Sequence, residues 1–234
     1  MRAAPNARPP TSADSLKAHL EGRTDLAESV VEVAGKSYHL VRPSVADALI
    51  DEREFEHDER LPYWAELWPS AIALARRLSR EDLAGKAAIE LGCGVGLPTV
   101  CALDRGARVL ATDHYEAALD FAAHNARRNG LPEPETALLD WHASRIGGRA
   151  SFDLVLAADV LYEERGARAL AGLVPGLLKP GGEALLADPG RRWEPLFREL
   201  MRGADFRFET EETTVRVEGV ERGVKVVLHR VRGG

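Results

Sequence analysis

Mainly apolar residues fill five short stretches in the middle of the chain. These stretches are 87–91, 108–113, 136–139, 152–158 and 183–187. Short apolar runs without regular polar alternation are typical of parallel strands that are covered on both faces. We therefore predict a strand for each stretch, with 87–91 buried in the centre of a sheet.

Segments with helical spacing of apolar residues separate these strands. We predict helices over 70–78, 99–105, 116–129, 165–178 and 193–201. Pro69 suits the start of the first helix, and Lys179-Pro-Gly-Gly182 is a stop signal after the fourth. Strand and helix alternating in this way predict a parallel sheet with right-handed connections.

The C-terminal part adds late strands to this sheet. Residues 206–210 and 215–218 form one strand or two, and 223–231 forms the last strand. The complete pattern predicts an α/β fold with a doubly wound, mostly parallel, seven-stranded Rossmann-like sheet.

The first 60 residues differ from the rest and predict an α+β extension. Residues 1–14 are rich in Pro, Ala and Arg and read as a flexible leader. In the extension, 15–60, we predict a short helix over 15–26, a hairpin of 29–33 with 36–41, and a short helix over 45–50. The charge run 51–60 reads as a solvated loop or a frayed helix. Residues 61–234 then form the main domain.

Composition narrows the range of functions. The formal net charge of −6 disfavours a general nucleic-acid binder, and no apolar run reaches the roughly 20 residues of a membrane span. Cys93 and Cys101 are too few for a disulfide framework, so reduced thiols in the cytoplasm are expected. The seven histidines are scattered, which argues against a metal site, and the N-terminus has no apolar core of a secretory signal.

A glycine turn follows the first buried strand. Gly92, Gly94 and Gly96 allow positive φ angles and a close approach of a ligand to the backbone. Pro98 suits the first turn of the helix that follows, whose N-terminus offers free N–H donors. A strand, a glycine turn and a helix in this order indicate a nucleotide-type cofactor site.

Two acids indicate which cofactor this is. A dinucleotide fingerprint would place glycine at position 97, which is Leu97. Glu90 instead precedes the turn, where a pyrophosphate would be repelled and a cation favoured. Asp113 ends the second strand, where an acid accepts ribose hydroxyls. The pattern resembles the class I S-adenosylmethionine-dependent methyltransferases, whose cofactor has a sulfonium, an ammonium and a ribose.

Acids follow or end five predicted strands. They are Glu90, Asp113, Asp140, Asp159 and Asp188. Because ligands of doubly wound sheets bind beyond the carboxyl ends of the strands, this row of acids favours a site at that edge.

Asp159 and Tyr162 are the candidate catalytic residues. In a turn, residues three apart share a face, so the carboxylate and the phenol would together hold an amine for methyl transfer. The alternative makes Asp159 a helix N-cap and Tyr162 a packing residue. The residues favour function for Asp159 and leave Tyr162 open. Trp64 and Trp68, upstream, are either packing residues or an aromatic wall over the cofactor, with packing favoured.

Several motifs together resemble the seven-β-strand protein lysine methyltransferases over residues 61–192. They are Trp-Pro-Ser, E-L-G-C-G-x-G-L-P, A-T-D, L-D-W and A-D-V-L-Y. The resemblance implies that Asp159 and Tyr162 contact the substrate lysine, that Trp141 covers the adenine and that Asp140 bonds its amino group. Asp188-Pro-Gly-Arg191 is similar to the subgroup acting on the electron-transfer flavoprotein β subunit. Motifs and resemblance together predict the cofactor contacts Trp68, Glu90, Gly92, Cys93, Gly94, Gly96, Asp113, His114, Asp140, Trp141 and Ala158.

We therefore predict a cytoplasmic class I methyltransferase that moves a methyl group from S-adenosylmethionine to a protein lysine, with no metal, nucleic acid or membrane involved. One alternative is a small-molecule N- or O-methyltransferase with the same cofactor site. A second alternative is a non-catalytic cofactor-binding partner protein.

Overall fold

A computed structural model of the chain describes residues 12–50, 61–142, 151–216 and 222–234. Most of the predicted leader and the charge run 51–60 lie outside the described residues. Of the helices formed by the described part of the chain, none combines the length and the apolarity needed to cross a membrane.

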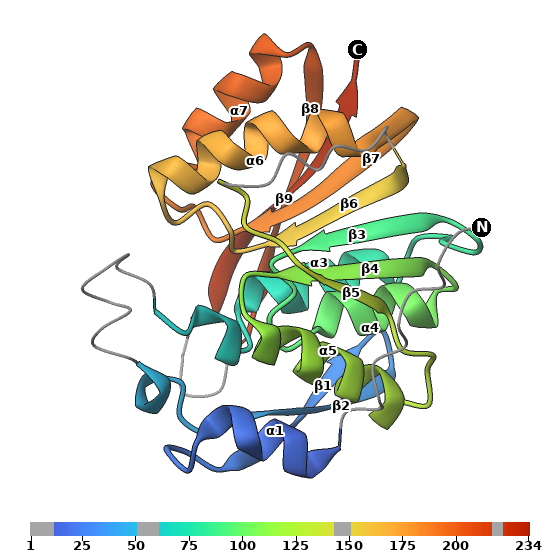
Figure 1. The fold of residues 1–234 in the computed structure, drawn as a ribbon. Coiled ribbons are helices and arrows are strands. Elements are labelled where there is room, and N and C mark those ends of the chain that lie inside the picture. The colour runs from blue at the N-terminus through green and yellow to red at the C-terminus, as the bar shows by residue number, and fades with distance from the viewer. Residues whose placement is uncertain (1–11, 51–60, 143–150, 217–221) are drawn as a thin grey trace, which may run out of the picture.

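A seven-stranded sheet in the order β5-β4-β3-β6-β7-β9-β8 forms the centre of the molecule (Figure 1). Its strands are β3 (Ala87–Leu91), β4 (Arg108–Asp113), β5 (Glu135–Leu138), β6 (Phe152–Ala158), β7 (Leu178–Asp188), β8 (Phe206–Val215) and β9 (Val224–Gly233). Strands β3 to β7 pair in parallel, whereas β9 is antiparallel to both β7 and β8. The predicted doubly wound, mostly parallel sheet is confirmed.

Helices cover both faces of this sheet (Figure 1). They are α3 (Pro69–Leu78), α4 (Leu97–Asp104), α5 (Glu116–Arg128), α6 (Glu164–Leu177) and α7 (Glu194–Gly203). On β3, Ile89 packs in the core beneath α6 and α7, whereas its neighbour Ala88 packs in the core beneath α3 and α4. The run of apolar residues in β3 is therefore explained, since both of its faces are buried.

The strand register brings the predicted chemistry to one edge. Leu91 of β3 pairs with Thr112 of β4 on one side and with Ala157 of β6 on the other. The residues that come directly after these three positions therefore meet at the carboxyl end of the sheet.

The N-terminal extension packs against α5. Its elements are α1 (Ala13–Leu20), β1 (Leu26–Val33), β2 (Lys36–Pro43) and the 3₁₀ turn η1 (Asp47–Leu49). The predicted hairpin is confirmed, but the first helix ends at Leu20, and Leu26 begins β1 instead. Leu16 and Leu20 are buried in the same cluster as Phe121 of α5, so the predicted apolar stripe attaches this helix to the main domain.

The fifth predicted strand begins earlier than the sequence indicates. The helix α6 does end at Leu177, before the predicted stop signal, but β7 begins at Leu178 and not at Glu183. The register between β6 and β7 shifts from Phe152↔Leu178 to Leu154↔Glu183, so the Pro-Gly-Gly segment is taken up as a bulge within the strand. Residues 206–215 form one strand, β8, paired along its length with β9, while positions 217 and 218 of the second predicted segment lie outside the described residues.

Candidate active site

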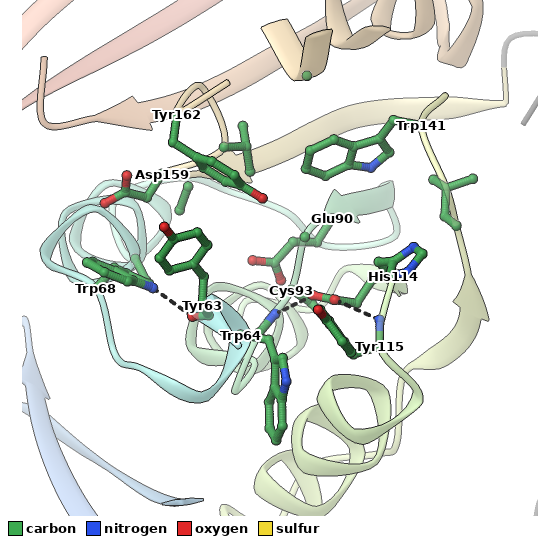
Figure 2. A pocket seen from close by; sticks show the side chains of 18 of the residues that line it. Tyr63, Trp64, Trp68, Glu90, Cys93, His114, Tyr115, Trp141, Asp159 and Tyr162 are labelled. Atoms are coloured by element: carbon green, nitrogen blue, oxygen red, sulfur yellow. Dashed lines mark hydrogen bonds between the residues drawn. The ribbon is translucent and has the colours of Figure 1, made fainter. Parts of the chain in front are cut away.

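One pocket opens at the carboxyl ends of β3, β4 and β6, and the empty space in and in front of it is about 1130 Å³. All of the residues predicted to contact cofactor or acceptor line it, and Figure 2 shows many of their side chains. Asp188, the fifth acid of the predicted row, does not line it. Its Oδ1 instead accepts the backbone N–H groups of Gly190 and Arg191 at 2.7 and 2.6 Å.

The glycine turn has the geometry that the sequence predicts. Gly92, Gly94 and Gly96 have φ angles of +75°, +51° and +87°, and Gly96 is the N-cap of α4. The space beside the turn is partly filled by protein. A Cβ atom on Gly92 would lie 3.3 Å from the Trp141 ring, and one on Gly94 would lie 3.1 Å from the carbonyl oxygen of Trp64. Because Gly92 and Gly94 have no side chains, Trp141 and Trp64 can lie directly against the turn.

Glu90 is a buried carboxyl at the base of the pocket. Its side chain accepts a hydrogen bond from the hydroxyl of Thr99, and only 1% of the residue is exposed. Burial raises the pKa of Glu90 to about 8, against an ordinary value of 4.5. A cationic group in the pocket would offset this cost and favour the ionised form.

Asp113 joins the end of β4 to the glycine turn. Its Oδ2 accepts the N–H of Gly94 at 3.0 Å, and its Oδ1 accepts the N–H of Tyr115 at 3.1 Å. Each oxygen keeps a lone pair for a ligand donor. Burial raises the pKa of Asp113, against the lowering effect of these backbone bonds.

Trp141 has a polar atom that lacks a partner. Its Nε1 is buried and finds no hydrogen-bond acceptor among the residues that the structure describes. Asp140, beside it, accepts the N–H of His142 at 2.8 Å. The benzo edge of the Trp141 ring, and not this N–H, lies against the glycine turn, so the ring offers the pocket an apolar surface.

Asp159 and Tyr162 lie at the other end of the pocket. Asp159 is 7% exposed and has a positive φ of 59°, which is rare for a residue with a side chain. It does not cap α6, whose N-cap is Glu163, so the alternative interpretation as a helix cap is wrong. In Figure 2 the carboxylate of Asp159 and the hydroxyl of Tyr162 point in opposite directions, so the predicted shared face is absent in this conformation.

The sequence interpretation missed two residues at this end, Tyr63 and Arg191. Tyr63, in the 3₁₀ turn η2 (Tyr63–Ala65), packs edge-on against Tyr162 with ring centroids 5.1 Å apart. Its carbonyl oxygen accepts the Trp68 Nε1–H at 2.8 Å. Arg191 donates from Nε to Asp159 Oδ1 at 2.6 Å. The aromatic-rich stretch 61–68 could have suggested Tyr63, but nothing local signals the ion pair.

The two tryptophans of that stretch have different surroundings. Trp64 is 9% exposed and packs on Phe121 of α5 with ring centroids 5.4 Å apart. Trp68, the N-cap of α3, lies 5.5 Å from the Arg191 guanidinium. The packing role holds for Trp64, although both rings line the pocket.

The described residues provide no set of ligands for a metal ion. Among the described residues, there is no cluster of three or more His, Cys, Asp or Glu side chains that could hold a metal ion. Cys93 and Cys101 are both buried and unpaired with each other.

A buried carboxyl suited to a cation, an acid at the end of β4 and an aromatic ring beside the glycine turn fit S-adenosylmethionine. The fold and the site are those of a class I S-adenosylmethionine-dependent methyltransferase. The chain belongs to the family described as "Lysine methyltransferase", whose sequence model matches residues 54–196, more than half of its length.

Individual relatives agree with this assignment. The chain is 37% identical over 107 residues to the histone-arginine methyltransferase METTL23 of Mus musculus, covering 43% of this chain and 42% of that protein. It is 35% identical over 135 residues to the electron transfer flavoprotein beta subunit lysine methyltransferase of Danio rerio, covering 56% and 51%. The chain thus spans about half the length of the curated relatives that it matches.

Solved structures show the same fold. The structure of magnesium protoporphyrin IX methyltransferase from Synechocystis PCC 6803 with bound SAM aligns with a TM-score of 0.56 at 22% identity. The alignment covers 70% of this chain and 78% of that one. At this identity the likeness supports the fold alone.

Proposed function

We propose that this protein transfers a methyl group from S-adenosylmethionine to the ε-amine of a lysine in a protein substrate. The observation that carries the proposal is the single pocket that joins the glycine turn after β3 to Asp159 and Tyr162 after β6. The family match and the relatives named as protein methyltransferases support it.

The cofactor end of the pocket is assigned from its charges. Glu90 holds the ammonium group, Asp113 accepts the ribose hydroxyls, and Trp141 with Asp140 contacts the adenine. When bound, the cofactor supplies an electrophilic methyl group on a positively charged sulfur. Trp68, Cys93, His114 and Ala158 complete the wall of the pocket around it.

Asp159 and Tyr162 position the acceptor amine, which requires the Tyr162 hydroxyl to turn from its direction in Figure 2 toward the Asp159 carboxylate. Methyl transfer needs the amine lone pair aimed at the methyl carbon, so the main tasks of the protein are alignment and exclusion of water. The rings of Tyr63 and Tyr162 meet at 5.1 Å beside Asp159, and they enclose the acceptor. The carboxylate accepts an N–H of the amine, which fixes the direction of the lone pair.

The setting and the domain plan are part of the same proposal. Two buried free thiols suit the reducing cytoplasm. We keep the division into a leader (1–14), an extension (15–60) and a catalytic domain (61–234), in which the extension contributes to substrate selection.

The test uses purified protein, tritiated S-adenosylmethionine and a lysate of cells that lack this gene. The expected result is a discrete labelled protein band that is lost with Asp159→Asn, with the label found on lysine by mass spectrometry. Asn keeps an oxygen for Arg191, so this variant removes charge with little change in packing. Thermal stabilisation by S-adenosylmethionine should persist in the variant.

Other outcomes contradict the proposal in different ways. Label only in the small-molecule fraction would support a metabolite methyltransferase. Label on arginine or histidine would mean that the protein methylates proteins, but at a residue other than lysine. Cofactor binding without label anywhere would support a non-catalytic partner protein.

A further inference from the structure

Arg191 is the last residue of the Asp188-Pro-Gly-Arg191 motif and contacts Asp159, the proposed acceptor-binding residue. Its Nε donates to Asp159 Oδ1 at 2.6 Å, and the Asp159 side chain is only 3% exposed. Among the described residues, this is the one ion pair that Asp159 makes. The second oxygen, Oδ2, has only a long contact of 3.4 Å from the Ser70 hydroxyl.

Arg191 is held in place by two further contacts. Its backbone N–H donates to Asp188 Oδ1 at 2.6 Å, which ties the residue to the end of β7. Its guanidinium lies 5.5 Å from the centre of the Trp68 ring. Burial lowers the pKa of Arg191, but the Asp159 carboxylate raises it by more. The pKa is therefore raised overall, and the side chain stays charged. The cation is thus fixed against Asp159, which lines the pocket, although Arg191 itself does not line it.

We propose that Arg191 is a positioning residue that neutralises Asp159, so that the site binds the acceptor as a neutral amine instead of an ammonium ion. This inference rests on the proposed function. An ammonium ion would place a second cation beside Arg191, whereas a neutral amine needs only a hydrogen-bond acceptor, which Asp159 Oδ2 provides. The proton that the amine carries in water passes to the solvent on binding. The bound nitrogen then has the lone pair that methyl transfer requires.

Other charged and titratable groups surround this pair. Tyr63 of η2, Glu66, Tyr162, Glu163 and Arg165 line the pocket together with Asp159, while Asp188 and Glu194 lie next to Arg191. Glu163 is paired with Arg165 at 2.7 Å. Burial raises the pKa of Tyr162, so this phenol stays neutral at physiological pH. Of these groups, Arg191 is the cation that pairs directly with Asp159, whereas Arg165 pairs with Glu163.

The test measures binding of n-butylamine, an analogue of the lysine side chain, to the full-length protein saturated with S-adenosylhomocysteine. Ligand-observed NMR at pH 7, 8 and 9 gives the apparent affinity. A site that selects the neutral amine should gain about tenfold in affinity per pH unit, because the free amine has a pKa of about 10.4. Arg191→Lys should keep this slope. Arg191→Gln exposes the bare carboxylate, which binds ammonium, so its affinity should be nearly independent of pH.

The double variant Asp159→Asn with Arg191→Gln covers the case in which the single variant fails to fold. It removes both charges and should keep the tenfold slope. A flat profile in the wild-type protein, equal slopes in the wild-type protein and Arg191→Gln, or a flat profile in the double variant would overturn the inference.

A turnover measurement separates this inference from the proposed function. This measurement uses the acceptor protein recovered from the lysate assay. Relative to the wild-type protein, the pH profile of kcat for Arg191→Gln should move to higher pH by about one unit or more. A merely structural role for Arg191 would lower kcat at every pH without moving the profile. Absence of transfer to any acceptor would contradict the proposed function, while the n-butylamine titration would still report on the charge of the site.

Discussion

Gly96 at the start of α4 lies against Ala122 of α5 with no room for a side chain between them. A Cβ atom on Gly96 would stand 2.7 Å from both the Cα and the Cβ atom of Ala122. The φ angle of Gly96, +87°, is also unfavourable for any other residue. The third glycine of the turn is therefore required by the packing of α4 on α5, whatever ligand binds above it.

We expect Gly96→Ala to destabilise the protein by about 3 kcal/mol, because it combines backbone strain with overpacking against Ala122. Urea unfolding at pH 7 measures this loss. Gly172→Ala is the matched control, since Gly172 is exposed on α6 and a Cβ atom there would have no other atom within 4 Å. That variant should be neutral or more stable by about 0.5–1 kcal/mol. A loss below about 1 kcal/mol in Gly96→Ala would show that α5 moves aside easily.

Asn125 links the N-terminal extension to the cofactor turn. Its Oδ1 accepts the N–H of Val41 at 2.7 Å, while its Nδ2 donates to the carbonyls of Val41 and Val95 at 2.9 and 2.8 Å. The residue is fully buried. We expect Asn125→Ala to cost about 3 kcal/mol of stability, because three buried backbone groups lose their partner. It should also weaken S-adenosylmethionine binding, since Val95 lies within the glycine turn.

Asn129, one turn later on the chain, gives the control for this prediction. It makes the same type of bonds to the backbone of His39, at 2.9 and 2.8 Å, but nearer to the surface. Water can replace these bonds, so Asn129→Ala should cost about 1 kcal/mol or less. Thermal unfolding and cofactor titration of both variants test the difference. Equal losses of stability in the two variants would show that the deeper burial of Asn125 does not add to the cost of removing its hydrogen bonds.

The inner strands β3 and β6 were predictable because they are largely buried and so carry continuous apolar runs. The edge strand β5 is more exposed and carries only a short run. The pocket was predictable for a related reason. Once five strands are parallel, residues that follow their carboxyl ends must meet at one edge, as Glu90, Asp113 and Asp159 do.

Contacts between distant segments were not predictable in the same way. Arg191 is 32 positions from Asp159, and their pairing depends on where the turn after β7 places the guanidinium. Asn125 gives no local sign that it binds Val41, 84 residues away. Lys179–Gly182 has a strong local turn signal, which the pairing of β6 with β7 overrides.

Tyr162→Phe should lower kcat about tenfold, the value of one hydrogen bond to the acceptor, and leave stability unchanged because the residue is 39% exposed. Phe keeps the ring contact with Tyr63, so the loss belongs to the hydroxyl. Tyr162→Leu removes the ring as well and should raise KM in addition. Steady-state kinetics on the acceptor protein from the lysate assay separate the two effects. An unchanged kcat in Tyr162→Phe would leave this tyrosine with a packing role alone.

Glu90 makes both stability and cofactor binding depend on pH. Its pKa is about 8 in the folded protein because of burial, against 4.5 for an ordinary glutamate. Between these values the folded protein binds more protons than the unfolded chain, so the free energy of unfolding falls as pH rises from about 4.5 to 8. A shift of this size sets an upper limit of about 5 kcal/mol on the loss.

Glu90→Gln removes this ionisation while keeping an oxygen for the Thr99 hydroxyl. We expect the variant to be more stable than the wild-type protein by about 2 kcal/mol at pH 8.5, or roughly 4–8 °C in Tm, and no more stable at pH 4.5. Glu66→Gln, at a partly exposed position of the same pocket, is the control and should show no such gain.

Cofactor binding should respond in the opposite direction. In the wild-type protein, affinity for S-adenosylmethionine should rise with pH up to about 8, as Glu90 ionises to meet the ammonium group, with proton release detectable by calorimetry in buffers of different ionisation enthalpy. In Glu90→Gln, binding should be weaker and should lack this proton release, because the neutral amide offers no charge to the ligand. Since the same carboxyl lowers stability and raises affinity, a variant that gained stability without losing affinity would show that the ammonium group is held elsewhere.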